Sequence, residues 1–328
     1  GGIVRALGAS EEPALATERS LTTPNHYAYL KISEGCNWMC GYCAIPLIRG
    51  RHVSVPMETL EEEARKLAAR GVKELIVIAQ DTTYYGIDLY GERRLAELLH
   101  RLCRIEGIEW IRLHYAYPAG FPDDVIEAMA SEPKICKYLD IPFQHISDAQ
   151  LAAMHRRHTK AEAMALIERL RARIPDLALR TTLLVGYPGE SDADFAELEE
   201  FVREVRFERL GVFTYSEEEG TYSAEHLADD VPEAVKQQRA ERIMALQRDI
   251  AREANARRTG RTERVIVDGR QGDFYVGRTQ YDSPEVDQEI LIPAGKRRLL
   301  RGRFYDVALV EASDYDLYGE AIGPARRR

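Results

Sequence analysis

Three of the five cysteines in the chain fall within eight residues, in the stretch SEGCNWMCGYCAIPLIRG. Cys36, Cys40 and Cys43 form a C-x3-C-x2-C pattern. A disulfide needs two thiols and a structural zinc site needs four ligands, so three cysteines complete neither. Cysteine thiolates are also the usual ligands of 4Fe–4S clusters, and three of them leave one iron open to a small molecule. The spacing therefore predicts a 4Fe–4S cluster with one open coordination position.

A zinc site remains open as an alternative. His52 follows the three cysteines closely enough to complete a Cys3His ligand set. Zinc sites more often use paired C-x2-C knuckles, and the sequence supplies only one such pair, which favours the cluster. Cys103 falls in an amphipathic stretch and Cys136 just before an apolar one, so we interpret both as buried cysteines without a chemical role.

Composition limits the class of protein. The 328 residues are 45% hydrophobic and 30% charged, as in an ordinary globular enzyme. A formal net charge of -9 argues against a general nucleic-acid binder, although a local basic face can be hidden inside an acidic total. No apolar run approaches the roughly 20 residues that cross a bilayer, and no signal peptide is evident. Clustered thiols favour the reducing cytoplasm.

The elements that must position the cysteines follow a regular alternation. Apolar stretches predicted as strands cover residues 27–32, 73–80, 110–116, 138–143, 178–185 and 209–215, and amphipathic stretches separate them. This alternation predicts a parallel sheet with right-handed helical crossovers, and six units are fewer than the eight of a closed barrel. We therefore expect an α/β fold built on a partial (β/α)6 barrel. The cysteine loop follows the first strand, at the end of the sheet where functional loops gather.

The chain divides into four predicted parts. Residues 1–25 show no strong period and are interpreted as a tail or linker, and residues 26–254 form the core domain. Beyond Gly260 the period changes to that of short alternating strands separated by turn residues, so residues 255–322 are predicted to form a small antiparallel β-barrel. Residues 323–328 form a C-terminal tail.

Several motifs resemble a known superfamily. Tyr42 precedes the third cysteine, and C-x3-C-x-aromatic-C is the motif of the radical S-adenosylmethionine (SAM) enzymes. IAQDTTYYGIDLYG, YLDIPFQHISD, LRTTLLVGYPGESDADF and GVFTYSEEEGTY resemble the methylthiotransferases of that superfamily, most specifically those that modify an aspartate of ribosomal protein S-twelve. The resemblance covers residues 27–320, and the C-terminal strands, including DYDLYGE, resemble that family's TRAM domain.

The resemblance implies a function and its cofactors. SAM would bind the open iron of the 4Fe–4S cluster, and a radical derived from SAM would take hydrogen from the β-carbon of the aspartate. A methylthio group would then join that carbon from a second 4Fe–4S cluster. The family holds that cluster on three cysteines of an N-terminal domain that this sequence does not contain, so we expect SAM cleavage without sulfur delivery. The implied partners are ribosomal protein S-twelve as substrate and a reductant protein as electron donor, in the cytoplasm.

Seven residues are predicted to bind the cofactor, and each also has an ordinary structural interpretation. Gln80 and Asp81 end the second strand, where turn and cap residues are also common. Arg180 lies in an apolar strand and needs either an acidic partner or the carboxylate of SAM. The glycines of VGYPGE permit close approach to adenosine but also suit a tight turn. The full set is Tyr42, Gln80, Asp81, Arg180, Gly186, Gly189 and Glu190.

Aromatic residues at the ends of the second and third strands are predicted to line the mouth of the barrel. There they would bracket adenosine or a substrate peptide, or simply close the barrel. They are Tyr84, Tyr85, His114, Tyr115 and Tyr117.

Two rival functions remain open. One is the sister methylthiotransferase that modifies an adenosine of transfer RNA, whose TRAM domain would need a basic surface. Residues 261–320 hold nine Lys and Arg against twelve Asp and Glu, which suits a basic ribosomal protein better. Direct nucleic-acid binding is therefore not expected, except that KRRLLRGR at 296–303 could touch ribosomal RNA. The other rival is a non-enzymatic, zinc-stapled protein that binds the ribosome.

Overall fold

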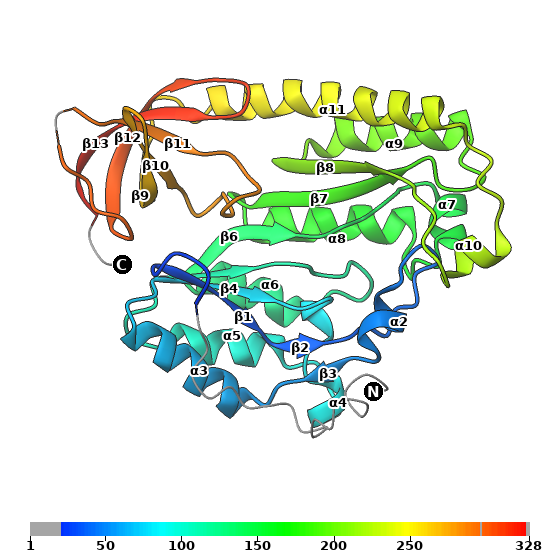
Figure 1. The fold of residues 1–328 in the computed structure, drawn as a ribbon, viewed down its shortest axis with the longest axis horizontal. Helices are drawn as coiled ribbons and strands as arrows, with labels where there is room; N and C mark the ends of the chain where they lie inside the picture. Colours follow the sequence, from blue (N-terminus) through cyan, green and yellow to red (C-terminus); the bar gives the residue numbers. More distant parts are fainter. Residues whose placement is uncertain (1–20, 296, 326–328) are drawn as a thin grey trace.

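A six-stranded parallel sheet forms the centre of the protein. The computed structural model describes residues 21–295 and 297–325. The strands follow one another in chain order across the sheet, and the two edge strands, β1 and β8, do not pair with each other. The predicted partial (β/α)6 barrel is therefore confirmed (Figure 1). The strands are β1 (Tyr27–Lys31), β4 (Glu74–Ile78), β5 (Trp110–Leu113), β6 (Ile135–Asp140), β7 (Ala178–Val185) and β8 (Arg209–Thr214).

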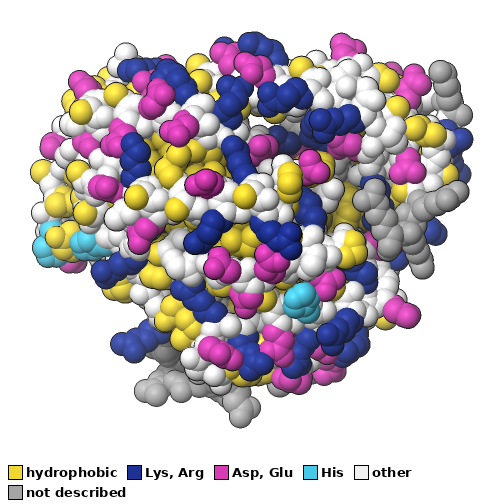
Figure 2. Space-filling model, turned by 180° about the vertical axis from the view of Figure 1, so that it is seen from behind, with side chains coloured by type: hydrophobic (Ala, Val, Ile, Leu, Met, Phe, Trp, Pro, Cys, Tyr) yellow, Lys and Arg dark blue, Asp and Glu magenta, His cyan; other side chains and the backbone are white. Residues whose placement is uncertain are grey.

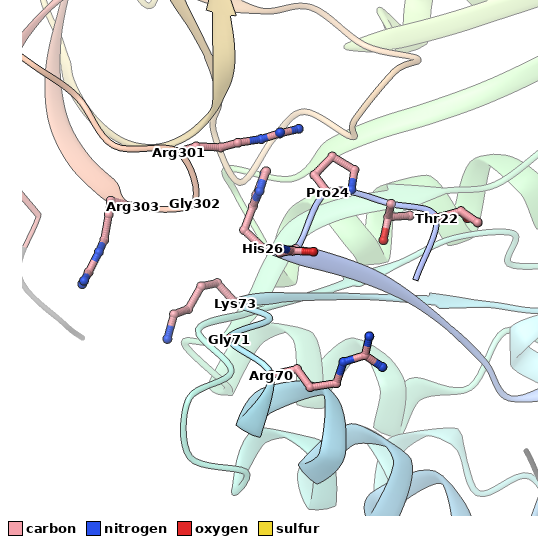
Figure 3. A pocket seen from close by; sticks show the side chains of 11 residues that line it. Thr22, Pro24, His26, Arg70, Gly71, Lys73, Arg301, Gly302 and Arg303 are labelled. Atoms are coloured by element: carbon pink, nitrogen blue, oxygen red, sulfur yellow. The ribbon is translucent and has the colours of Figure 1, made fainter. Parts of the chain in front are cut away.

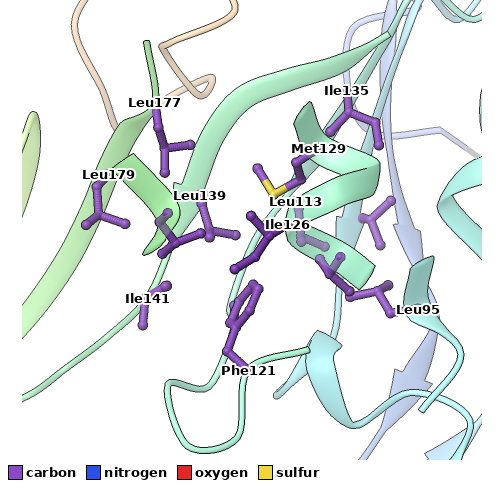
Figure 4. Packing of buried hydrophobic residues seen from close by; sticks show 14 of the residues in the cluster. Leu95, Leu113, Phe121, Ile126, Met129, Ile135, Leu139, Ile141, Leu177 and Leu179 are labelled. Atoms are coloured by element: carbon purple, nitrogen blue, oxygen red, sulfur yellow. The ribbon is translucent and has the colours of Figure 1, made fainter. Parts of the chain in front are cut away.

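Helices cover the outer face of this sheet and bury its apolar side chains. Figure 4 shows Leu113 and Leu139 from the sheet packing against Ile126 and Met129 of one helix, with Phe121 closing the layer. Each such side chain contributes about 1.5–3 kcal/mol when fully buried. The helices are α3 (Met57–Ala69), α5 (Leu95–Cys103), α6 (Asp123–Ser131), α8 (Lys160–Arg173) and α9 (Asp192–Val205). None of the described helices is long and apolar enough to cross a membrane.

Local sequence signals fix where two of these helices begin. Thr159 caps α8 and Ser191 caps α9, and each forms a capping box with the acidic residue three positions later, Glu162 or Asp194. An N-cap of this kind contributes about 1 kcal/mol. The start of α9 is thus held directly after the loop VGYPGE.

Several short elements were not predicted from the sequence. They lie mostly at the carboxyl end of the sheet, and their lengths are too short to show a period. They are β2 (Ser33–Glu34), α2 (Ile45–Arg49), β3 (Val53–Ser54), η1 (Thr82–Tyr84), α4 (Ile87–Tyr90), α7 (Asp148–Ala153) and α10 (Tyr222–His226).

The long helix α11 (Glu233–Ala256) leads from the core to a second, smaller barrel. Ile243 and Ile250 lie seven residues apart on one side of this helix, face the core and are buried. After it, five strands close into a barrel in the order β10-β11-β13-β12-β9, which confirms the small barrel. Whether the domains divide at residues 254 and 255 stays a prediction. The strands are β9 (Thr262–Gln271), β10 (Phe274–Arg278), β11 (Ile290–Pro293), β12 (Phe304–Ala312) and β13 (Leu317–Pro324).

The small barrel differs from the prediction in one pairing. β11 and β13 run parallel, whereas its other strand pairs are antiparallel. The stretch EVDQEILI alternates in the manner of a strand, but only its last part is one, because residues 285–289 form a loop before β11. Two acidic side chains of that loop reach the core instead: Glu285 accepts a hydrogen bond from Tyr27, and Asp287 pairs with Arg180.

Buried ion pairs join the barrel to the amino ends of the core strands. Glu74, the first residue of β4, lies 2.7 Å from Nε of Arg112 and 2.8 Å from Nη2 of Arg278 in the barrel. Arg278 also pairs with Asp268 at 2.6 Å, and Asp268 lies 2.7 Å from Nε2 of His26. Burial alone would raise the pKa of Glu74, but the two arginines hold it below its ordinary value. The barrel is thereby fixed at the end of the sheet opposite the cysteine loop.

Candidate cluster and cofactor site

The cysteine loop is held at its start by a two-stranded ribbon of β2 and β3. The backbone N–H of Cys36 donates to the carbonyl of Gly50 at 3.1 Å. Gly35 has a φ of 80°, and a Cβ there would lie 2.1 Å from the carbonyl oxygen of Arg51. Only glycine permits both this φ and this approach. The glycine before the first cysteine is therefore required to close the loop.

The second half of the loop is held by segments far along the chain. The N–H of Gly41 donates to the carbonyl of Met154 at 2.9 Å, and its carbonyl accepts from the N–H of Ser223 at 2.9 Å. A Cβ on Gly41 would lie 2.9 Å from the hydroxyl of Tyr187. The backbone between the second and third cysteines is thus fixed before any ligand binds.

The three cysteines line a single cavity at the carboxyl ends of β1, β4, β5 and β6. Its volume is about 430 Å³, within the range of small-molecule sites. Of the predicted cofactor-binding residues, Tyr42 and Gln80 lie in its wall. The remaining lining residues are Lys31, Trp38, Ile45, Ile78, Ala79, Tyr115, Ala116, Tyr117, Pro142, Gln144 and Arg156.

The surroundings of the thiols disfavour free thiolates, so a bound cation is needed to deprotonate them. Burial raises the pKa of Cys36 to about 11, and the nearby thiols add to this effect. Burial also raises the pKa of Cys43. Bound metal deprotonates coordinating thiols outright. Three half-buried thiols around one cavity are therefore a donor set that fits iron.

The arrangement fits a cluster better than a single ion. In the described part of the chain, no three or more His, Cys, Asp or Glu side chains are placed to hold a metal ion. The predicted fourth zinc ligand, His52, does not line the cavity, and its Nε2 lies 3.1 Å from Oγ of Ser54. A 4Fe–4S cluster binds each thiolate at a different iron, so its ligands surround a volume rather than meet at a point. The geometry thus disfavours the Cys3His zinc alternative.

Arg156 is the main site residue that the sequence analysis missed. It is buried, and its Nη1 lies 3.6 Å from Sγ of Cys40 and 3.4 Å from the hydroxyl of Tyr42. The guanidinium also stands over the ring of Tyr117, 4.3 Å from its centre. Its Nε has no hydrogen-bond partner among the described residues. This positive charge offsets the negative charge of coordinated thiolates. No spacing rule connects HRRH at 155–158 to a cysteine more than a hundred residues earlier.

Trp38, inside the cysteine motif, was also missed. Its ring stacks on Tyr117 with centroids 4.0 Å apart and an interplanar angle of 7°. Its Nε1 donates to Oδ2 of Asp81 at 2.6 Å. The stacked pair forms one flat wall of the cavity.

Gln80 and Asp81, adjacent in sequence, have different roles. The side chain of Gln80 donates to Oε1 of Glu34 at 2.7 Å, but its own Oε1 is buried without a partner among the described residues. The hydrogen-bonding capacity of Asp81 is already used within the protein, since its Oδ1 accepts from N and Oγ1 of Thr83 and from N of Tyr117. It caps η1 and does not line the cavity, as the turn-and-cap interpretation expected.

No residue of the loop VGYPGE lines the cysteine cavity, although its Tyr187 packs against Tyr42, and the loop also contacts α11. Gly186 has a φ of 71°, and a Cβ there would lie 2.2 Å from Cγ of Lys236. Glu190 accepts from the N–H of Gly186 and lies 3.2 Å from Nη1 of Arg239. The N–H of Gly189 donates to Asp230. The structure therefore gives these residues the setting of a tight turn.

Arg180 also lies outside the cysteine cavity. Its Nη1 pairs with Asp287 of the barrel at 2.8 Å, and its Nε lies 3.7 Å from Asp140. This is the structural ion pair that the sequence left open. Burial raises the pKa of Asp140 to about 6, although Arg180 counteracts the rise.

Two of the five predicted aromatic residues, Tyr115 and Tyr117, line the cavity. Tyr84 packs edge-on against Trp38 behind the wall. Tyr85 is buried and donates to the carbonyl of Val55, and His114 contacts Ser283 of the barrel.

Comparison with known proteins places this site in a family. A model of the radical SAM superfamily matches residues 30–202, and a model of the TRAM domain matches residues 259–322. Among solved structures, coproporphyrinogen III oxidase (HemN) from Escherichia coli, described as a radical SAM enzyme, has a TM-score of 0.52 at 16% identity. It covers 79% of this chain and 68% of its own, and it supports the fold alone.

Two curated relatives are far more similar. The ribosomal protein uS12 methylthiotransferase RimO of Christiangramia forsetii is 56% identical over 321 residues, which cover 98% of this chain and 71% of the relative. RimO of Bacteroides fragilis is 52% identical and covers 98% of this chain and 74% of its own length. These matches confirm the resemblance to the methylthiotransferases. The chain belongs to the ribosomal protein uS12 methylthiotransferase (RimO) family of the radical SAM superfamily.

Proposed function

We propose that this protein takes part in the methylthiolation of an aspartate of ribosomal protein uS12, using a 4Fe–4S cluster and SAM. The observation that carries the proposal is the single cavity of about 430 Å³ at the carboxyl end of the sheet, lined by all three motif cysteines. Membership of the RimO family supports the substrate and the reaction.

Cys36, Cys40 and Cys43 would hold the cluster. One-electron reduction of the sulfonium of SAM is the chemistry that such a cluster supplies when bound. Arg156 stabilises the coordinated thiolates through its contact with Cys40. Because the guanidinium is buried against aromatic rings, its charge is screened little by water.

Other residues of the cavity would bind and orient SAM. The unpartnered Oε1 of Gln80 would accept a hydrogen bond from the amino group of the methionine part, since a buried acceptor left unpaired costs about 1–3 kcal/mol. The stacked rings of Trp38 and Tyr117 provide an apolar wall that excludes water from the sulfonium. Tyr42, packed between Arg156 and Tyr187, keeps the loop rigid around the third cysteine.

The second cluster and the remaining partners also belong to this proposal. The other two cysteines, Cys103 and Cys136, are buried on different elements and cannot form a set of three. A second 4Fe–4S cluster would therefore be bound outside these 328 residues. The electron donor would be a reductant protein, and the compartment would be the cytoplasm, where thiols stay reduced.

Anaerobic reconstitution with iron and sulfide tests the proposal. We expect about four irons per chain and cleavage of SAM to 5′-deoxyadenosine under reducing conditions. Cys36→Ala should abolish both, whereas Cys103→Ala, which removes a buried cysteine away from the cavity, should retain both. This chain alone should yield no methylthiolated uS12.

Mass spectrometry of uS12 and of transfer RNA, after reaction with a chain that includes the second cluster, decides the substrate. Modification of the uS12 aspartate supports the proposal. Modification of transfer RNA adenosine would support the sister activity instead. One zinc per chain and no SAM cleavage would support the non-enzymatic alternative.

A further inference from the structure

The inner face of the core sheet carries a pair of charged side chains close to the cysteine cavity. On β6 and β7, Leu139 and Leu183 pack in the outer core, so alternate residues of these strands point to the inner face. Asp140 and Arg180 are among these residues and lie opposite each other in the strand pairing. Pro142, two residues beyond Asp140, already lines the cavity. The charged pair therefore lies on the inner face, directly before the strand ends that form the cavity.

Tyr115 connects this pair to the cavity. It lines the cavity and is half-exposed. Burial raises the pKa of Tyr115, Asp140 adds to the rise and Arg180 opposes it, so its hydroxyl lies near both charges. Its φ of 55° falls in the left-handed region that bulky side chains rarely adopt, and the N–H of Thr82 holds its carbonyl at 3.0 Å. Residues held in this region cluster at functional sites.

Asp140 is buried but incompletely paired. It is 4% exposed, and its Oδ1 has no hydrogen-bond partner among the described residues. Nε of Arg180 lies 3.7 Å from this oxygen, too far for a hydrogen bond. Burial raises the pKa of Asp140 to about 6, while Arg180 opposes this rise and Asp287 adds to it. The protonated form, which carries a hydrogen-bond donor, is therefore accessible near neutral pH.

The guanidinium of Arg180 is held on one side only. Its Nη1 donates to Oδ1 of Asp287 at 2.8 Å, and Oδ2 of Asp287 accepts from the N–H of Ser283 at 2.9 Å. Nε and Nη2 of Arg180 form no hydrogen bond with the described residues, and the side chain is 20% exposed. Arginine binds a carboxylate through two parallel N–H groups. The edge formed by Nε and Nη2 is thus a preformed place for a carboxylate.

Other cations are poorly placed to meet an anionic group at the cysteine cavity. Lys31 and Arg156 line it, but Lys31 pairs with Glu34 at 2.6 Å and Arg156 contacts Cys40. Elsewhere on the surface Lys and Arg stand among Asp and Glu, as on the face in Figure 2. The arginines in Figure 3 line a separate cavity at the opposite end of β1 from the cysteine loop.

We propose that Arg180 and Asp140 bind the carboxyl group of the target aspartate and thereby select aspartate as the residue that is modified. This inference rests on the proposed function, in which the β-carbon of that aspartate loses hydrogen. The β-carbon is bonded directly to the carboxyl carbon, so a held carboxylate also fixes the reacting carbon. Arg180 would donate two hydrogen bonds to the carboxylate, through Nε and Nη2.

Binding of the carboxylate is coupled to a proton on Asp140. Two adjacent carboxyl groups cannot both stay ionised, so they share one proton. The groups that face Asp140 are Arg180, Asp287, Tyr115 and Tyr138. Asp287 already pairs with Arg180, and burial raises the pKa of both tyrosines, so Asp140 takes up the proton and donates it in a hydrogen bond to the substrate. Binding of the aspartate should therefore weaken as the pH rises.

A double-mutant cycle tests this site. Reconstituted protein with SAM and without reductant is titrated with fluorescently labelled uS12, and with uS12 whose target aspartate is replaced by alanine. At low pH the aspartate form should bind roughly tenfold more tightly, since hydrogen bonds to charged groups have effects of this size. In Arg180→Met the two forms should bind equally. The matched control Asp287→Asn removes only the structural partner of Arg180, so it should lower the unfolding temperature and keep the preference.

Asp140→Asn separates the proton from packing, because asparagine has the same shape and always carries a donor. The preference for the aspartate form should decline from about pH 6 to about pH 8 in the original chain and stay constant in Asp140→Asn. This comparison needs no folded Arg180 variant.

An undiminished preference in Arg180→Met would overturn the inference, and so would a preference in the original chain that does not change with pH. Absence of any preference for the target aspartate, including absence of uS12 binding, also overturns it. The proposed function is judged separately, by SAM cleavage in the same preparation after a reductant is added.

Discussion

The contact with the small barrel and the cysteine cavity, at opposite ends of the core sheet, treat buried charge in opposite ways. At the amino ends of the strands, Arg112 and Arg278 share Glu74, and Arg180 meets Asp287. At the carboxyl ends, Arg156 is buried beside thiols rather than carboxylates. Burying a charge costs several kcal/mol unless it is paired. The buried charges at the amino ends are therefore paired within the protein and join the two domains. The charge of Arg156 at the carboxyl ends gains an anionic partner only when the thiolates hold a ligand.

Removal of Cys36 should produce the largest effect at the carboxyl end, namely loss of the cluster and of SAM cleavage.

At the amino end the largest effect should come from Glu74→Ala. This change leaves Arg112 without its carboxylate and Arg278 with Asp268 alone. We expect a loss of about 3–5 kcal/mol in the free energy of unfolding, measured by chemical denaturation. The control Glu62→Ala, which removes an exposed pair with Lys66, should leave the free energy of unfolding nearly unchanged, because water screens such a pair. A similar loss of unfolding free energy in Glu74→Ala and Glu62→Ala would contradict the special role of the buried pairs at the amino ends.

Arg156→Ala sharpens the comparison at the carboxyl end. We expect the reconstituted protein to lose iron to a chelator about 10–100 times more readily, because residues that support metal ligands have effects of this size. Arg157→Ala is a closely matched control, since it removes an exposed arginine one position away. Arg156→Lys should retain iron to an intermediate degree, because lysine lacks the planar fork. Equal iron retention by the Arg156 and Arg157 alanine variants would contradict the role of Arg156.

Gln80→Ala and Asp81→Ala separate a ligand-binding residue from a structural neighbour. The first should raise the Kd for SAM by roughly tenfold and cost little stability, because it removes one part-buried hydrogen bond, to Glu34, and Oε1 of Gln80 has no protein partner to lose. The second should lower the free energy of unfolding by about 1–2 kcal/mol, because it removes the cap of η1. Calorimetric titration of the reconstituted protein and thermal unfolding measure the two quantities. A normal Kd for SAM in Gln80→Ala would exclude its role.

Low pH should weaken the buried ion pairs that join the small barrel to the amino ends of the core strands. Burial would raise the pKa of Asp268, but Arg278 and His26 hold it below its ordinary value, and Arg278 and Arg112 do the same for Glu74. A carboxyl group with a lowered folded pKa contributes stability above its unfolded pKa and loses it as the pH falls through the folded value. The free energy of unfolding should therefore decline below about pH 4. Asp268→Asn should flatten this decline, and an unchanged profile would contradict the assignment.

The sequence predicted the framework well and the site only in part. The alternation of strands and helices identified all six core strands, since each is apolar and bounded by turn residues. The cysteine motif and Gln80 line one cavity, as a position directly after a strand suggests, because loops at the carboxyl ends of parallel strands meet. Arg156 and Trp38 were missed because their contacts depend on how distant loops meet. Arg180 shows the converse: its buried charge was correctly noted, but the partner lies in the other domain, more than a hundred residues away.

Electron paramagnetic resonance of the reduced, reconstituted protein, recorded with and without SAM, tests the central claim most directly. If the three cysteines hold a 4Fe–4S cluster with one open iron, the spectrum should show a reduced cluster whose g-values shift when SAM is added. Cys36→Ala should give no such signal, and Arg157→Ala should behave like the original chain. A cluster signal that SAM leaves unchanged, or a colourless protein with one zinc, would contradict the account.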